Sequence, residues 1–176
     1  PIVLARLGEA YHKTKAYDKS VEMYQKAMAA NPAESAYHNN LGNVYADMGK
    51  YPEAAAEFKK AAEMDPSHAA SYYFNYGAIL YNQGKMDEAV EAFQKSVGSD
   101  PNYAEGQFML GQALMGKLDM DPKTGKIIAA AGTVEALEAY LKLEPAGKHA
   151  AEAQSMLQTL QSSVETSYKK PKKAKS

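Results

Sequence analysis

Apolar and small residues recur along this chain in steps of three and four, and polar residues fill the positions between them. Near the start of the chain, Leu7 and Tyr11 belong to one such series, and Ser20, Tyr24 and Ala27 form a second one after a polar break. Because an α-helix has about 3.6 residues per turn, this spacing puts the apolar residues on one side of a helix. The pattern therefore predicts pairs of amphipathic helices joined by short turns.

The same pattern returns around four glycines, Gly8, Gly42, Gly77 and Gly111, which are 34, 35 and 34 residues apart. A large apolar residue stands before each glycine and another follows three residues after it: Leu7, Leu41, Tyr76 and Leu110, then Tyr11, Tyr45, Leu80 and Leu114. In the first three copies a small residue and then an aromatic residue follow: Ser20, Ala54 and Ala89, then Tyr24, Phe58 and Phe93. A period near 34 is typical of stacked helix–turn–helix repeats.

The turns between the expected helices have their own signals. Gly49 and Gly84 follow the first helices of the second and third repeats, where glycine accepts the left-handed conformation that ends a helix. Each repeat closes with Asn or Asp before Pro, at Asn31-Pro32, Asp65-Pro66 and Asp100-Pro101. We expect the Asn or Asp to cap the next helix and Pro to occupy its first position.

These residues and their spacing resemble the tetratricopeptide repeat family over roughly residues 1 to 145. The sequence departs from the family at the fourth repeat position, where the usual Trp is replaced by Leu4, His38, Tyr73 and Gln107. The resemblance implies an all-α fold, a right-handed α-solenoid of four helix–turn–helix repeats followed by a C-terminal capping helix. The closing run from Tyr140 to Ala153 is similar to that of bacterial cell-envelope repeat proteins. It favours a bacterial protein of the cell envelope or periplasm over a cytoplasmic one.

We expect a repeat domain over residues 1–165 and a disordered, lysine-rich tail over 166–176. The repeats are predicted near 1–34, 35–69, 70–103 and 104–146, with the capping helix at 148–165. In the fourth repeat thirteen extra residues separate the two helices, so an insert is predicted at 117–131. Its apolar residues flank a turn-forming run and indicate a short β-hairpin: Leu118, Met120, Ile127 and Ile128. This insert is either a binding element or a spacer, and Thr133 is expected to cap the helix after it.

Candidate chemistry is sparse. The chain has no cysteine, and its four histidines lack a second ligand at metal-binding spacing. There is no glycine-rich phosphate loop, and the segment from Asp119 lacks the glutamate of a calcium loop. No catalytic residues, metal or cofactor are therefore expected, and the chain is interpreted as non-enzymatic. The net charge is −1 although the tail holds five lysines, so we interpret that tail as a solvated end rather than a site for nucleic acid or anionic lipid.

The family resemblance also implies a concave groove lined by the first helix of each repeat. Carried over position by position, the predicted partner-binding residues are Arg6, Asn39, Asn40, Asn43, Phe74, Asn75, Tyr81, Asn82, Phe108, Met109 and Gln112. Glu9, His12 and Asp47 fall on further groove positions. Asn40 and Asn75 share one position and resemble an asparagine ladder, whose amides both donate to and accept from a peptide backbone. The positions that clamp a chaperone's terminal carboxylate lack cations, which disfavours that ligand.

The sequence thus predicts a non-enzymatic protein–protein interaction scaffold that holds a peptide or helix of a partner, with no small-molecule substrate. The groove is expected to be polar at the second repeat and apolar at the third and fourth. An alternative is that the asparagines are only solvated and the aromatic residues pack internally. A second alternative is a structural subunit that self-associates or docks in a larger assembly. The apolar start Ile2–Leu4 and the insert would mediate that docking, unless additional sequence precedes Pro1 and covers the start.

Overall fold

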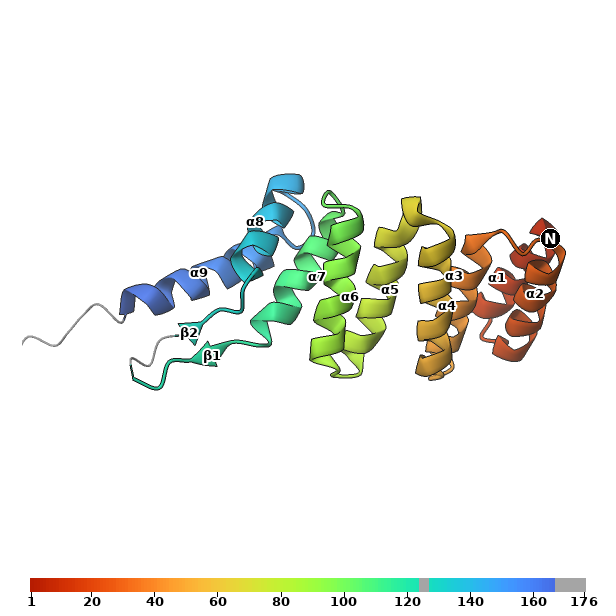
Figure 1. Ribbon diagram of the computed structural model, residues 1–176, viewed down its shortest axis with the longest axis horizontal. Coiled ribbons are helices and arrows are strands. Elements are labelled where there is room, and N and C mark those ends of the chain that lie inside the picture. The colour runs from red at the N-terminus through yellow and green to blue at the C-terminus, as the bar shows by residue number, and fades with distance from the viewer. Residues whose placement is uncertain (124–126, 167–176) are drawn as a thin grey trace, which may run out of the picture. The chain divides into compact units, whose positions relative to one another are not determined.

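The computed structural model describes residues 1–123 and 127–166, with side chains described up to Gln161. The chain divides into two compact units, Pro1–Tyr103 and the part from Ala104 onward, here called unit 1 and unit 2 (Figure 1). Residues 124–126, which include Thr124 and Gly125 of the turn predicted at 121–125, and the lysine tail from 167 lie outside the described residues. Within the described residues, none of the helices combines the length and the apolar character that crossing a membrane requires.

Unit 1 consists of three helix–turn–helix repeats, as the glycine spacing predicts. The first helices are α1 (Ile2–Lys13), α3 (Ser35–Asp47) and α5 (Ala69–Asn82), and their partners are α2 (Tyr17–Ala30), α4 (Tyr51–Met64) and α6 (Met86–Ser99). A short 3-10 helix, η1 (Pro66–His68), joins α4 to α5. Each first helix packs against its own second helix, and within unit 1 helix α2 packs against α3 and α4 packs against α5. The repeats are therefore stacked in chain order.

The core of unit 1 lies between the two helices of each repeat. The repeat aromatic residues Tyr24, Phe58 and Phe93 are at most 1% exposed. Two buried serines replace an apolar residue in the second helices, and each donates a hydrogen bond to a backbone carbonyl of the first helix. Ser20 Oγ reaches Gly8 O, and Ser96 Oγ reaches Ala70 O, both at 2.7 Å. These bonds satisfy buried hydroxyls where two helix backbones approach closely.

The predicted left-handed turns are confirmed. Gly49 and Gly84 have φ angles of 74° and 72° at the ends of α3 and α5. The equivalent turn after α1 contains Lys15, which adopts φ 59° although it has a side chain. Left-handed backbone is costly for residues other than glycine, so this turn is the strained member of the set.

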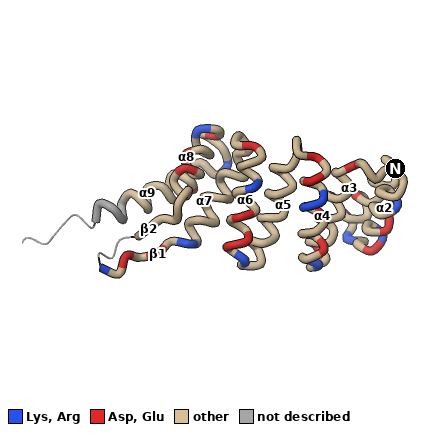
Figure 2. Tube along the Cα trace, viewed as in Figure 1, with Lys and Arg blue, Asp and Glu red and all other residues tan. Residues whose placement is uncertain are grey.

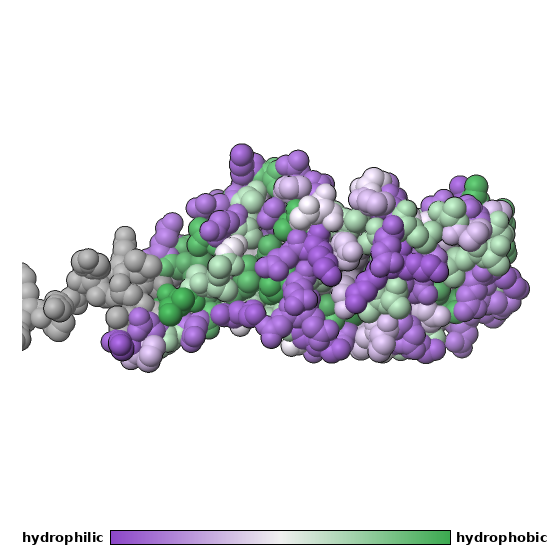
Figure 3. Space-filling view, in the orientation of Figure 1, coloured by the Kyte–Doolittle hydropathy of each residue, from purple (hydrophilic) through white to green (hydrophobic). Residues whose placement is uncertain are grey.

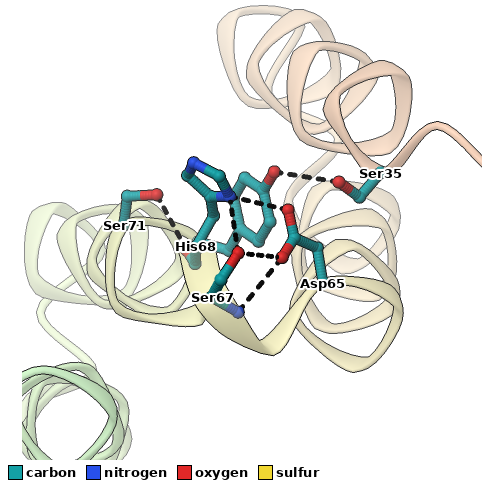
Figure 4. Close-up of polar contacts among 6 residues, drawn as sticks. Ser35, Asp65, Ser67, His68 and Ser71 are labelled. Carbon is teal, nitrogen blue, oxygen red and sulfur yellow. Dashed lines mark hydrogen bonds and ion pairs between the residues drawn. The ribbon is translucent and has the colours of Figure 1, made fainter.

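The Asp-Pro turns differ in part from the expectation. Asp65 does cap η1, with Pro66 as its first residue, but the α-helices of the following repeats begin later, at Ser35, Ala69 and Ala104. Asp65 accepts hydrogen bonds from Ser67 N at 3.1 Å and from the hydroxyl of Ser67, and His68 Nδ1 lies 2.6 Å from it (Figure 4). The carboxylate thus closes a tight turn rather than capping an α-helix, because the side chain reaches only two or three residues ahead.

Unit 2 contains the fourth repeat and the last helix: α7 (Ala104–Met115), α8 (Thr133–Leu143) and α9 (Ala150–Thr166). The insert between α7 and α8 forms the predicted hairpin. Strand β1 (Asp119–Met120) runs antiparallel to β2 (Ile127–Ile128), with Asp119 opposite Ile128. The predicted cap of α8 is wrong by one residue. Gly132, with φ 90°, occupies the cap position, while the buried Thr133 begins the helix and its hydroxyl donates to Ala130 O at 2.6 Å.

Candidate functional site

The first helices α3 and α5 are almost free of charge. Helix α5 has no Asp, Glu, Lys or Arg, and α3 has Asp47 as its last residue (Figure 2). Beside the carboxyl-terminal parts of α1, α3 and α5 lies an open cavity of about 550 Å³, here called the unit 1 groove. It is lined by His12, Asn43, Ala46, Asp47, Tyr51, Asn75, Ala78, Ile79 and Asn82. The groove therefore has amide side chains, a histidine–aspartate pair, one phenol and a small apolar surface.

Three hydrogen-bonded asparagine side chains extend from the groove into the interior of unit 1. Asn75 Nδ2 of α5 donates to Asn39 Oδ1 of α3 at 2.9 Å, and Asn39 Nδ2 donates to Asn40 Oδ1 at 3.3 Å. Asn40 also hydrogen-bonds with the side chain of Tyr24. Burial raises the pKa of Tyr24 to about 12, and the carboxylate of Glu9 adds to this shift, so the phenol stays neutral at physiological pH. The hydrogen bond that Asn75 donates to Asn39 fixes Asn75, whose amide has further hydrogen-bonding positions.

His12 and Asp47 form a polar pair at the end of the groove. His12 Nε2 lies 2.8 Å from Asp47 Oδ2, so the pair joins α1 to α3. The side chain of His12 is 23% exposed and that of Asp47 is 58% exposed. The imidazole of His12 also lies against the ring of Tyr17, with ring centroids 6.0 Å apart. The histidine is thus held in place, while the carboxylate keeps an accessible side.

The structure brings together only part of the predicted site in unit 1. Asn43, Asn75 and Asn82 line the groove. Asn39 and Asn40 are half-buried and stand behind Asn75 through the bonds above. Arg6, which is exposed, and Tyr81, which is half-buried, are not among the residues that line this cavity.

Phe74 of α5, the aromatic residue predicted to contact a partner from the third repeat, also differs from the prediction. Phe74 packs against Phe93 and, edge-on, against Tyr103, with ring centroids 5.9 and 5.4 Å apart. Its ring is half-buried by these neighbours within unit 1. The alternative that this aromatic residue packs internally is therefore the better description, because two rings of its own unit already contact it.

The predicted apolar groove of the fourth repeat is wrong for Phe108. This side chain is 1% exposed, and its ring is stacked on His149 with centroids 4.0 Å apart and planes inclined by 7°. Tyr140 of α8 contacts it from another side, at 5.3 Å between centroids. Phe108 belongs to the core because His149, just before α9, and Tyr140 of α8 cover its ring.

Met109 and Gln112 are also engaged by other residues of unit 2. Met109 packs against the buried cluster that includes Leu137 and Ala153. Gln112 Nε2 donates to Glu152 Oε1 at 3.1 Å. At the start of α7, Glu105 forms an ion pair with Lys148 at 2.8 Å, and this bond raises the pKa of the Lys148 ammonium. Phe108 and Gln112, two of the predicted groove residues, therefore contact residues at or just before α9, and Met109 packs against the buried cluster of unit 2.

Several residues that line the unit 1 groove were not predicted from the sequence. Tyr51 is the first residue of a second helix, α4, whereas the family resemblance assigns the groove to first helices. A signal for Tyr51 existed, because it directly follows the Gly49-Lys50 turn and so begins beside the end of α3. Ala46, Ala78 and Ile79 are small or aliphatic and carry no chemical signature that distinguishes a groove from a core.

Unit 2 has a smaller cavity of about 250 Å³ where the hairpin meets α9. Its lining is Ile127, Ala129, Val134, Leu157, Leu160 and Gln161. Figure 3 shows hydrophobic side chains gathered over this part of unit 2, and Met120 and Ile128 of the hairpin are 62% and 49% exposed. In the described part of the chain, no group of three or more His, Cys, Asp or Glu side chains is arranged to hold a metal ion.

Comparison with known proteins supports the repeat assignment. A family model described as "Tetratricopeptide repeat" matches residues 39–104, and one described as "TPR repeat" matches residues 8–49. The Hsp70-Hsp90 organizing protein 3 of Arabidopsis thaliana is 38% identical over 56 residues. That match covers 32% of this chain, and the chain spans only 10% of the length of that protein.

Solved structures show the same fold. A crystal structure of MamA protein superimposes with a TM-score of 0.65 and 18% identity, covering 93% of this chain and 86% of MamA. The first TPR of Spaghetti (RPAP3), bound to the HSP90 peptide SRMEEVD, has a TM-score of 0.58 and 24% identity. It covers 66% of this chain and 91% of that one. The repeat spacing, the paired helices of both units and the two matching family models agree, and the chain belongs to the tetratricopeptide repeat family.

Proposed function

We propose that this protein is a non-catalytic interaction scaffold whose unit 1 groove binds an extended segment of a partner protein. Proteins of the tetratricopeptide repeat family are generally interaction scaffolds, and one structural relative has a peptide bound. The observation that carries the proposal is the set of amides Asn43, Asn75 and Asn82, which line one open groove from two neighbouring first helices. A peptide backbone offers both N–H donors and C=O acceptors, and an amide side chain matches both.

The groove is partly organised before any ligand binds. Asn75 is held by Asn39, and His12 is held by Asp47, so these side chains have already lost part of their rotamer freedom. Binding costs less when the contact residues are fixed beforehand. Ala46, Ala78 and Ile79 leave a small apolar floor on which side chains of a partner segment would pack. A groove with this composition suits a peptide better than a compact charged metabolite.

The same residues favour binding over catalysis. His12 and Asp47 have the relative orientation of a base and its partner, but a nucleophilic hydroxyl or thiol side chain of Ser, Thr or Cys is not found among the described residues that line the groove. Acid–base chemistry needs a further group within reach of the histidine. The pair is better explained as a polar link between α1 and α3.

A display experiment tests the proposal. Random twelve-residue peptides would be selected on the intact protein, and the affinities of the enriched peptides measured by calorimetry. We expect Asn43→Ala and Asn75→Ala each to weaken binding about tenfold, because each removes a hydrogen bond from the contact. Gln94→Ala, on the exposed side of α6, is the control and should leave affinity unchanged. No enriched peptide, or equal affinity in all three variants, would contradict the proposal.

A second candidate function, a structural subunit, is favoured by the exposed start of α1. Ile2 and Val3 are 66% and 72% exposed, and Leu7 is 43% exposed on the same helix. Exposed apolar side chains grouped in this way are typical of a contact surface. Light scattering over a range of concentrations separates the two functions. A defined oligomer that dissociates in an Ile2→Glu, Val3→Glu variant would support the structural role, and a monomer at all concentrations would argue against self-association.

A further inference from the structure

We propose that the unit 1 groove selects a partner segment by an arginine side chain, which pairs with the carboxylate of Asp47 and stacks on the ring of Tyr51. This inference rests on the proposed function, since it names the chemistry of the segment that the groove would bind. It goes beyond a general peptide groove because it assigns specificity to two residues.

The charge of the residues that line the groove favours a cationic side chain in the partner segment. Among the described residues that line it, Asp47 is the acidic one and Lys and Arg are absent. Helix α5, which forms one wall, has no charged residue at all. When His12 is neutral the groove therefore has a local negative charge, which attracts a cation and repels a carboxylate. A partner segment with an acidic side chain at this point would have no cation in the lining to pair with.

Asp47 has the geometry that a guanidinium needs. Its side chain is 58% exposed although it lies at the cavity, and His12 engages its Oδ2 atom. A carboxylate has about four acceptor positions, so one bond to imidazole leaves room for the N–H groups of an arginine. The bond also limits the rotation of Asp47, so less entropy is lost when the arginine binds. Arginine fits better than lysine because its planar group can donate two parallel hydrogen bonds to one carboxylate.

Tyr51 supplies the second contact. It is 41% exposed at the first residue of α4 and lines the same cavity as Asp47. A guanidinium stacks on an aromatic face while its edge remains able to donate hydrogen bonds in its own plane. The aliphatic part of the arginine side chain would lie over Ala46, Ala78 and Ile79, which line the rest of the cavity. Carboxylate, ring and apolar floor thus match the three parts of one side chain.

Four peptide mixtures test this inference with the intact protein. Each mixture is an eleven-residue, fluorescein-labelled library of neutral residues with Arg, Lys, Gln or Glu fixed at the centre, and binding is followed by fluorescence anisotropy. The Arg mixture should bind about tenfold more tightly than the Gln mixture, and the Glu mixture should bind most weakly. Asp47→Asn should remove the preference for Arg over Gln without weakening the Gln mixture. Tyr51→Ala should reduce the preference for Arg over Lys.

The control is Glu91→Gln, which removes one negative charge from the exposed side of α6, and it should keep the Arg preference. Thermal unfolding of every variant checks that the fold is intact. If Arg and Gln mixtures bind equally while Asn75→Ala weakens both, the arginine inference is wrong and the peptide groove stands. A loss of affinity for all four mixtures in Asp47→Asn would also overturn it, because Asp47 would then act only on the shape of the groove. If no mixture binds at all, both the groove function and this inference fail.

Discussion

A β-carbon built on Gly77 of α5 would lie 2.7 Å from Cε1 of Phe93 in α6. Phe93 is completely buried, so its ring contacts other core residues rather than solvent. The equivalent distance from Gly42 to the ring of Phe58 is 3.0 Å. The repeated glycine is thus the point of closest approach between the two helices of a repeat, and the third repeat, where a β-carbon would force Phe93 to shift, is the tightest of the three in unit 1.

Replacing Gly77 with Ala should destabilise unit 1 by about 1–3 kcal/mol, because the new methyl group overpacks the core. This loss exceeds the gain of up to about 1 kcal/mol that alanine normally brings to a helix. Gly98→Ala is the matched control, since Gly98 is also helical and a β-carbon there would meet nothing within 4 Å. It should stabilise by about 0.5–1 kcal/mol. Urea unfolding measures both, and equal stability of the two variants would mean that Phe93 can yield.

Lys15→Gly should stabilise the protein by about 1 kcal/mol. Lys15 holds φ 59°, in the left-handed region where the equivalent turns have Gly49 and Gly84. Glycine relieves this strain, although the unfolded chain gains some entropy in return. Thermal unfolding measures the effect, and Gly84→Lys provides the reverse comparison with an expected loss of similar size. A destabilised Lys15→Gly variant would contradict the strain argument.

Much of the fold could be predicted from the sequence because the signals are local and periodic. The pairing of a glycine with an aromatic residue, as in Gly42 and Phe58, recurs in the neighbouring repeats. The left-handed caps need only a glycine at the right place in the turn. The hairpin was predictable for the same reason, since its apolar residues flank a turn-forming run. Gly132 shows the limit of this reasoning, because Thr133 has a capping side chain but uses it on Ala130 instead.

The site was harder to predict because it depends on which elements cover one another. The family positions assign Asn43, Asn75 and Phe108 to the groove, but of these three only Asn43 and Asn75 line the unit 1 groove. Phe108 is covered by Tyr140 of α8 and by His149, forty-one residues later in the sequence, which stacks on its ring. No spacing within α7 could reveal that contact. Tyr51 was missed for the opposite reason, since it enters the groove from a helix that was expected to face away.

Phe108→Ala should therefore act on stability. The side chain is buried between His149 and Tyr140, so its removal leaves a cavity and should destabilise unit 2 by about 3–5 kcal/mol. Hydrogen exchange of the α9 amides measures the effect where it arises, because α9 residues complete the same cluster. Phe108→Leu keeps most of the volume and should lose less than about 1.5 kcal/mol. Unchanged exchange in Phe108→Ala would indicate that this residue faces a partner instead of the core.

The Asp65 turn should control part of the acid stability of unit 1. The hydrogen bond from Ser67 lowers the pKa of the Asp65 carboxyl most, and the bond with His68 lowers it further. Because the folded state binds this proton less readily, its stabilising effect is present above the unfolded value, near pH 4, and is lost as the pH falls through the lowered folded value. NMR titration of Asp65 tests the cause. Ser67→Ala should raise this pKa more than His68→Ala does, and Asp65→Asn should flatten the loss of stability below about pH 4 in urea unfolding. A larger effect of His68→Ala would mean that the ion pair, rather than the turn geometry, keeps the carboxyl ionised.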